Sequence, residues 1–185
     1  LIVGLLKAYR NVNEVISGIM LNWIGLYLVN TLLSNVKEST SPYTYALGKT
    51  NKAAILPGGG LPAVFSNNGY VTIAIPLSII IAVLIDILLT KTKIGYELRA
   101  TGFNKEAARY AGMNEKRNII LTMVIAGTLA GLGAALLFLT GFEQWQCSQS
   151  SVPGMGFNGI AAAFLGGLNP IGNIFSSYFI QHITN

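Results

Sequence analysis

An amide and an indole stand next to each other inside an apolar run, "VISGIMLNWIGLYLVN". A buried amide without a partner is costly, so Asn22 and Trp23 are expected to face protein or a cavity. An aromatic ring beside an amide suits the face of a nucleobase or a sugar. The same two residues would also serve an interhelical hydrogen bond with a packed indole, and the sequence leaves both interpretations open.

Two further amides lie beside glycines in "GFNGIAAAFLGGLNP". Asn158 and Asn169 fall in the apolar region 152–183, which two glycines and a proline interrupt. Each half is too short to cross a bilayer alone, and such breaks are tolerated where protein or a watery cavity covers the freed backbone. This pattern predicts two half-helices or a re-entrant pair, and such breaks in transporters commonly lie near the solute path.

The residues that usually hold metals or carry out covalent chemistry are scarce. Cys147 is the only cysteine and His182 the only histidine, so neither an internal disulfide nor a cysteine cluster for a metal is available. A clustered nucleophile, base and metal ligand are not visible, which disfavours a membrane enzyme. No cofactor is expected.

The elements that must position these side chains are long apolar helices. The 185 residues are 52% hydrophobic and 10% charged, with mean hydropathy +0.55. A helix of about 20 residues crosses the hydrocarbon core, and the runs 15–36, 71–90 and 118–142 reach that length. A soluble bundle would keep a polar stripe on each helix, which these runs lack. The expected fold is all-α, a polytopic transmembrane helical bundle forming a single domain over residues 1–185.

Basic residues orient the bundle. Seven of the twelve Lys and Arg residues lie in residues 91–117, called here the charged segment. The excess of positive charge places this segment in the cytoplasm and residues 37–70 on the outer side, as an extracytoplasmic loop with little regular structure. The net charge of +5 therefore reflects topology, and no basic patch outside the segment supports nucleic-acid binding.

Capping residues predict a short helix inside the charged segment, over residues 105–111. Asn104 is a suitable N-cap, Glu106 lies in the first turn, Arg109 lies in the last turn, and Gly112 fits the left-handed position beyond the end. A helix of two turns is marginal alone and usually needs a partner.

Small residues mark a packing side on this short helix, namely Ala107, Ala108 and Ala111. Asn114 and Glu115 then look like the cap and first turn of the next membrane helix. A solvated linker that only joins two spans would show similar caps, so the spacing alone does not decide between linker and docking element.

Several motifs in order resemble one family. The stretches "VNEVISGIMLNWIGLYLV", "GYELRATGFNKEAARYAGMNEKRNIILTMVIAGTLAGLGAALL" and "PGMGFNGIAAAFLGGLNPIG" resemble permease subunits of bacterial ABC importers for simple sugars, nucleosides and branched-chain amino acids, closest to the nucleoside type. The resemblance covers most of the chain, and the outer loop is its least diagnostic part. The chain starts in "LIVGLL" without Met, which indicates a piece of a longer permease.

The resemblance implies a multi-pass subunit of the bacterial cytoplasmic membrane with no ATPase chemistry of its own. The implied partners are a separate ABC ATPase subunit, a second permease subunit, an extracytoplasmic substrate-binding protein or lipoprotein, and the lipid bilayer. The positions implied at the ATPase contact are Arg99, Gly102, Asn104, Ala107, Ala108 and Gly112. The nucleoside type usually has Asp at the position of Asn158, so this chain lacks a charge there.

The expected function is transport of nucleosides, with Asn22, Trp23, Asn158 and Asn169 along the path. Ribose or another simple sugar is the alternative solute. A channel or structural membrane protein without ATP coupling is the alternative from another class, and it would tolerate loss of the short helix.

Overall fold

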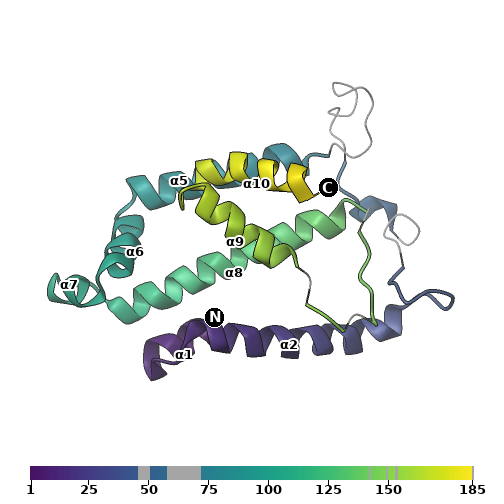
Figure 1. Cartoon of the computed structure of the whole chain (residues 1–185), viewed down its shortest axis with the longest axis horizontal. Coiled ribbons are helices and arrows are strands. Elements are labelled where there is room, and N and C mark those ends of the chain that lie inside the picture. The colour runs from purple at the N-terminus through teal and green to yellow at the C-terminus, as the bar shows by residue number, and fades with distance from the viewer. Residues whose placement is uncertain (46–50, 58–71, 142, 149, 153, 185) are drawn as a thin grey trace. The chain divides into compact units, whose positions relative to one another are not determined.

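The computed structural model describes residues 1–45, 51–57, 72–141, 143–148, 150–152 and 154–184. Helices make up most of these residues, and the described part holds isolated β-bridges but no longer strand (Figure 1). The chain divides into two compact units. The first comprises Leu1–Ile75 with Met123–Val152, and the second comprises Pro76–Thr122 with Pro153–Asn185.

Three helices of the described part are long and apolar enough to cross a membrane. They are α2 (Glu14–Leu33, continued by a 3-10 turn to Val36), α5 (Ala74–Lys91) and α8 (Glu115–Leu139). The three spans expected from the sequence are thereby confirmed, with ends shifted by a few residues. Two expected ends, Val71 and Phe142, lie outside the described residues.

These helices present apolar side chains all around. No residue of α5 is buried within the chain, and Asn118 is the one buried residue of α8. Large aliphatic side chains such as Ile80 and Leu84 are more than half exposed. Exposed apolar surface of this extent is stable only when lipid or other protein covers it, so the fold is that of an all-α membrane protein.

In the first unit, a short helix, α1 (Ile2–Arg10), turns sharply into α2. Asn11 takes the left-handed conformation with φ of 50°. The Asn13 side chain then caps α2 by accepting a hydrogen bond from the Val15 N–H at 2.9 Å. An ion pair of 2.6 Å between Lys7 Nζ and Glu14 Oε2 joins the two helices across the turn.

At the other end of α2, two connecting segments pair with each other. Residue Tyr43 forms a β-bridge with Gln146, and the Thr44 N–H donates to the Trp145 carbonyl at 2.9 Å. The Trp145 indole N–H donates to Asn30 Oδ1 at 2.8 Å, which ties this pairing to α2. Residues 37–45 otherwise form turns and isolated β-bridges, and residues 51–57 contain one 3-10 turn (Lys52–Ala54), so the described residues of 37–70 have little regular structure, as expected; residues 46–50 and 58–70 lie outside the described part.

In the second unit, the interrupted region forms two helices, as the sequence predicts. They are α9 (Met155–Leu165) and α10 (Pro170–Thr184), which pack against each other (Figure 1). At about 1.5 Å per residue, their 11 and 15 residues leave each shorter than a bilayer core. The helix break is confirmed, while the depth of the pair in a membrane stays a prediction.

The turn between α9 and α10 depends on close backbone approach. A Cβ on Gly166 would lie 2.8 Å from the Gly172 carbonyl carbon and would also collide with Asn173 Oδ1. Gly167, with φ of 66°, ends α9 in the left-handed conformation. The Ser176 hydroxyl donates to the Ala162 carbonyl at 2.7 Å, which fixes one helix on the other.

Candidate functional site

The charged segment folds as two consecutive helices between α5 and α8 (Figure 1). The first, α6 (Lys93–Phe103), was not predicted from the sequence. The Thr92 hydroxyl accepts from the Gly95 N–H at 3.1 Å and donates to the Leu88 carbonyl at 2.6 Å, so it caps α6 and holds it to the end of α5. The sequence signal was weak: the buried residues Gly95, Leu98 and Thr101 recur at helical spacing, but only Leu98 is a large apolar residue.

Gly95 is required where α6 turns back on α5. A Cβ at this position would lie 2.5 Å from Leu89 Cα and 2.6 Å from the Leu89 carbonyl oxygen. A side chain therefore cannot be accommodated without moving backbone, and the absence of one lets α6 begin directly against the last turns of α5.

The second helix, α7 (Lys105–Tyr110), confirms the predicted short helix to within one residue. Asn104 Oδ1 accepts from the Ala107 N–H at 3.0 Å, as expected for its cap. Gly112 has φ of 79°, and the Met113 N–H donates to the Ala108 carbonyl at 3.0 Å. That bond and the one from the Gly112 N–H to the Arg109 carbonyl form a Schellman motif, which satisfies the carbonyls left free at the helix end.

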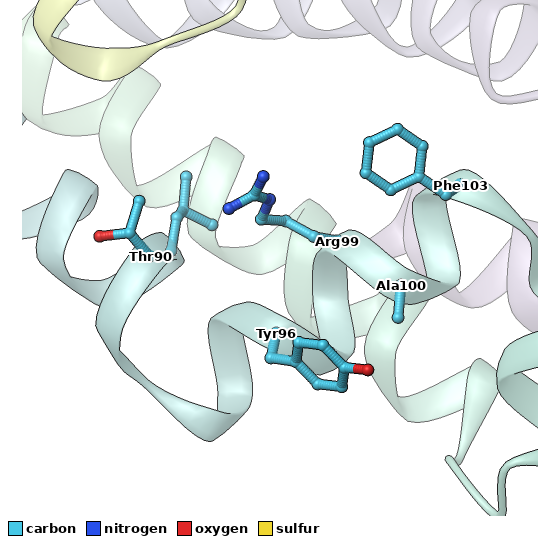
Figure 2. Close-up of a pocket in the computed structure, with 6 residues that line it drawn as sticks. Thr90, Tyr96, Arg99, Ala100 and Phe103 are labelled. Carbon is cyan, nitrogen blue, oxygen red and sulfur yellow. The ribbon is translucent and has the colours of Figure 1, made fainter.

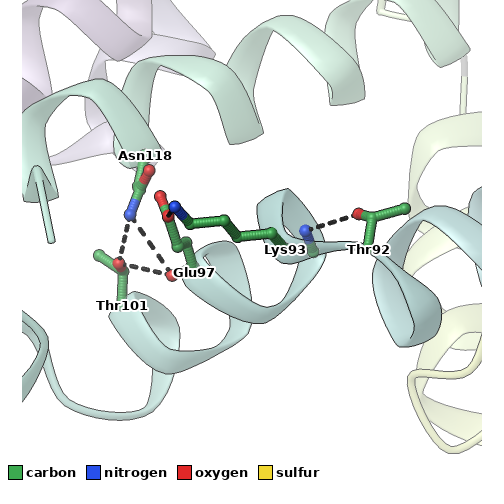
Figure 3. Close-up of polar contacts among 6 residues, drawn as sticks. Thr92, Lys93, Glu97, Thr101 and Asn118 are labelled. Atoms are coloured by element: carbon green, nitrogen blue, oxygen red, sulfur yellow. Dashed lines mark hydrogen bonds and ion pairs between the residues drawn. The ribbon is translucent and has the colours of Figure 1, made fainter.

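A buried amide holds α6 to the start of α8 (Figure 3). The Asn118 Nδ2 group donates to Thr101 Oγ1 at 2.9 Å and to the Glu97 carbonyl at 3.4 Å. The Thr101 hydroxyl itself donates to the same Glu97 carbonyl at 2.7 Å. Asn118 is only 3% exposed, so these bonds form away from water, where an unsatisfied amide is costly.

Charges connect the short helix to α8 as well. Lys105 Nζ, at the start of α7, lies 3.9 Å from Glu115 Oε2, in the first turn of α8. The Asn114 side chain caps α8 by accepting from the Arg117 N–H at 3.1 Å, which confirms its expected role. The two helices and the start of α8 are thus joined by hydrogen bonds and one ion pair.

The predicted packing side of α7 is only partly right. Ala108 is buried, at 3% exposed, whereas Ala107 and Ala111 are exposed. The helix has a single turn and a half, so within the chain one alanine faces inward and its neighbours face outward. The structure brings five of the six positions implied at an ATPase contact, Gly102 to Gly112, around α7.

The sequence reasoning missed two exposed aromatic rings in the charged segment. Phe103, at the end of α6, is 85% exposed and Tyr110, at the end of α7, is 90% exposed. Gly102 lies beside Phe103, and a Cβ there would meet nothing within 4 Å. Aromatic rings exposed to this degree are typical anchors of protein interfaces, and their position at the ends of a short helix was the available signal.

The sixth position, Arg99, lies apart, on the surface of α6 toward the end of α5. A hollow of about 380 Å³ is lined there by Leu89 and Thr90 of α5 and by Tyr96, Arg99, Ala100 and Phe103 of α6. Figure 2 shows the Arg99 side chain extending toward Thr90.

The three amides and the indole proposed for the solute path are divided between the two units. In the first unit, Asn22 and Trp23 are exposed on α2, and the Trp23 ring stacks on Tyr27 with centroids 6.2 Å apart. In the second unit, Asn158 is exposed on α9. Asn169 Oδ1 accepts from the Ile171 N–H at 2.9 Å, so this side chain caps α10 whatever else it contacts.

No cluster of three or more potential metal ligands occurs among the described residues. Cys147 is partly buried, and its thiol lies 3.6 Å from the Leu33 carbonyl.

Comparison with known proteins identifies the relatives of this chain. It is 37% identical over 187 residues to a nucleoside ABC transporter permease protein of Lactococcus lactis, and 36% identical over 176 residues to a guanosine ABC transporter permease protein of Bacillus subtilis. Each alignment covers 95% of this chain and 49% of the relative. A D-allose transport system permease protein of Escherichia coli is 29% identical, with 83% of this chain and 51% of the relative covered.

The chain thus spans about half the length of the curated relatives it matches. No solved structure matches it. The family model for the permease component of branched-chain amino acid transport systems matches residues 1–185, the whole chain. The three apolar spans, the interrupted helix pair and this match agree: the chain belongs to the family of branched-chain amino acid transport system permease components.

Proposed function

We propose that the chain forms part of the permease subunit of an ATP-driven importer for nucleosides in the bacterial cytoplasmic membrane. The observation that carries the proposal is the capped helix α7 in a chain whose relatives include ABC permeases. The Lys105–Glu115 pair joins α7 to α8, and Asn118 holds the preceding helix α6 to α8. Nucleosides are favoured because the two relatives with 37% and 36% identity are named for nucleosides and guanosine.

The charged segment would dock on a separate ATPase subunit. The positions proposed at this contact are Gly102, Asn104, Ala107, Ala108 and Gly112; the resemblance also implies Arg99, which lies apart on the surface of α6. Ala108 is buried and would contribute indirectly, by packing α7 against the rest of the chain. Gly102 and Ala107 are exposed and would contact the partner directly. A helix of six residues is not stable in water alone, so support from a partner would complete it.

The solute path is proposed to include Asn22, Trp23, Asn158 and Asn169. The exposed Trp23 ring, already stacked on Tyr27, offers an aromatic face for a nucleobase, and amide groups can donate to and accept from ribose hydroxyls. A second permease subunit would cover the exposed faces of the spans that line the path. The paired segments around Trp145 and Thr44 are proposed to meet the extracytoplasmic substrate-binding protein.

A simple-sugar solute is the second candidate, because the D-allose permease is also a relative. The two candidate solutes are distinguished by measuring uptake of radiolabelled guanosine, uridine and ribose in cells that carry the complete permease, its ATPase and its binding protein. Nucleoside uptake that depends on the ATPase supports the proposal; ribose uptake alone replaces the solute, and uptake without the ATPase contradicts coupling.

The docking surface is tested in the same cells with Gly102→Asp. Because a Cβ at Gly102 meets nothing within 4 Å, the substitution leaves the fold intact and changes only the surface. Arg117→Gln, on α8, is the matched control, since it changes the net charge of the charged segment by the same one unit. We expect Gly102→Asp to abolish uptake and ATPase co-purification with the permease still in the membrane, and Arg117→Gln to retain both.

A further inference from the structure

The hollow beside Arg99 carries a cation without a protein partner. Among the described residues, no hydrogen bond or ion pair is formed by the Arg99 guanidinium, and the nearby carboxylate of Glu97 lies 3.9 Å from Lys93 Nζ instead. Arginine matches the geometry of a phosphate with two parallel N–H donors. The unpartnered group in this hollow is therefore suited to an anionic oxygen ligand.

The walls of the hollow place it at the end of a membrane span. Leu89 and Thr90 belong to the last turn of α5. This helix of 18 residues is mostly apolar, with Asp86 and Lys91 as its charged residues, and none of its residues is buried. Lys91 and Lys93 follow immediately and are exposed. An apolar span that ends in basic residues ends at the headgroup region of a bilayer.

The aromatic lining agrees with this position. Tyr96 is 65% exposed and Phe103 85% exposed, and both rings line the hollow with Arg99 (Figure 2). Tyr is enriched at the membrane–water interface, where its ring contacts acyl chains and its hydroxyl is hydrated, and the Phe103 ring adds an apolar wall beside it. A volume of about 380 Å³ also falls within the range of about 300–1,000 Å³ that small-molecule sites occupy.

We propose that this hollow binds the phosphate of an anionic phospholipid headgroup from the cytoplasmic leaflet, with Arg99 as the phosphate ligand and Lys91 and Lys93 as supporting charges. Basic pockets at the cytoplasmic ends of membrane helices are suited to such headgroups. The site rests on the proposed cytoplasmic side of the charged segment. It assigns Arg99 a lipid contact in place of the ATPase contact that the resemblance implies.

Native mass spectrometry of the complete, purified transporter tests the site. The protein is titrated with phosphatidylglycerol, with phosphatidylcholine, and with inorganic phosphate as competitor. We expect Arg99→Gln to weaken binding of one phosphatidylglycerol about tenfold through loss of a charge-assisted, bidentate contact. Arg99→Lys is expected to lose less, because it keeps the charge but not the fork of donors.

Arg109→Gln, which removes the same charge from α7, is the matched control and is expected to bind phosphatidylglycerol like the unmodified protein. Equal phosphatidylglycerol binding by Arg99→Gln and the unmodified protein would overturn the site. Displacement of phosphatidylglycerol by millimolar phosphate would identify free phosphate, not lipid, as the ligand. If Arg99→Gln lost association with the ATPase but bound lipid normally, Arg99 would belong to the ATPase contact. Because lipid binding is measured without transport, these outcomes are distinct from failure of the proposed nucleoside uptake.

Discussion

At the scale of single residues, Asn118 is the side chain on which the charged segment depends most. It comes from the first turn of α8 and satisfies two acceptors of α6, Thr101 Oγ1 and the Glu97 carbonyl. We expect Asn118→Ala to lower the free energy of unfolding by about 1–3 kcal/mol, because Thr101 and Glu97 then lose a donor in a site closed to water. Thermal unfolding of the complete permease in detergent measures this change.

A double-mutant cycle separates the hydrogen bond from general packing. Thr101→Val keeps the shape of the side chain and removes the hydroxyl, so its cost and that of Asn118→Ala should not add, with a coupling of about 0.5–3 kcal/mol. Thr128→Val, at an exposed position further along α8, is the control and should combine additively with Asn118→Ala. Additive costs for Asn118 and Thr101 would contradict the proposed link.

Two glycines of the charged segment, Gly102 and Gly112, differ in backbone conformation. Gly112 has φ of 79°, and Gly102 is helical; a Cβ at either position meets nothing within 4 Å. Steric space is thus equal, and only backbone conformation differs. We expect Gly112→Ala to destabilise the protein by about 1–2 kcal/mol and Gly102→Ala to stabilise it by up to about 1 kcal/mol. The same unfolding assay compares the pair, and changes of equal sign would be inconsistent with the left-handed end of α7.

At the scale of helices, the interrupted pair α9–α10 depends on two glycines in contact. A Cβ on Gly166 would meet Asn173 and the backbone of Gly172, so Gly166→Ala must push the helices apart. We expect a loss of about 1–3 kcal/mol and less permease assembled in the membrane. Gly159→Ala, in the open middle of α9, is the control and should be neutral or stabilising. A small loss of stability for both Gly166→Ala and Gly159→Ala would contradict the requirement for close backbone contact between α9 and α10.

Helix ends that depend on neighbouring residues could be predicted from the sequence, whereas contacts between residues far apart in the sequence could not. The caps Asn104 and Asn114 and the end at Gly112 act on neighbouring residues, so they predicted α7 and the start of α8. In contrast, Asn118 pairs with Thr101 across 17 positions, and Trp145 with Asn30 across 115. Nothing in the local pattern indicates these partners.

Helix α6 was not predicted, for a related reason. Its buried face consists of Gly95, Leu98 and Thr101, of which only one is a large apolar residue. Hydrophobic periodicity therefore barely marks the helix, and the charged residues around it resemble a loop. The caps placed α7 correctly in the sequence, but spacing alone did not indicate which alanine faces inward: Ala108 is buried, whereas Ala107 and Ala111 are exposed.

At the scale of the whole molecule, basic charge is concentrated in one connection. Residues 91–117 hold seven of the twelve Lys and Arg residues. They occupy α6, α7 and the junctions with α5 and α8, all in the second unit. Within the first unit, α2 joins the Lys7–Glu14 pair at one end to the Trp145–Asn30 contact at the other. An apolar helix of 20 residues between these ends is long enough to cross the bilayer, so the two contacts should lie on opposite sides.

Thiol reagents can test on which side of the membrane α7 and the paired segments around Trp145 lie. The complete permease is prepared with Cys147 and any other cysteine replaced by Ser, and single cysteines are introduced at Glu106 in α7 or at Ser148 beside the paired outer segments. Both residues are exposed or in a turn, so neither substitution disturbs a buried contact. The concentration of positive charge predicts that α7 lies in the cytoplasm. We therefore expect an impermeant maleimide to label Ser148→Cys in intact cells, and Glu106→Cys only after the membrane is permeabilised. Labelling of both cysteines from the same side of the membrane would contradict this topology, and with it both the ATPase contact and the cytoplasmic lipid site. Labelling from opposite sides would agree with both proposals, which the co-purification and lipid-binding experiments then distinguish.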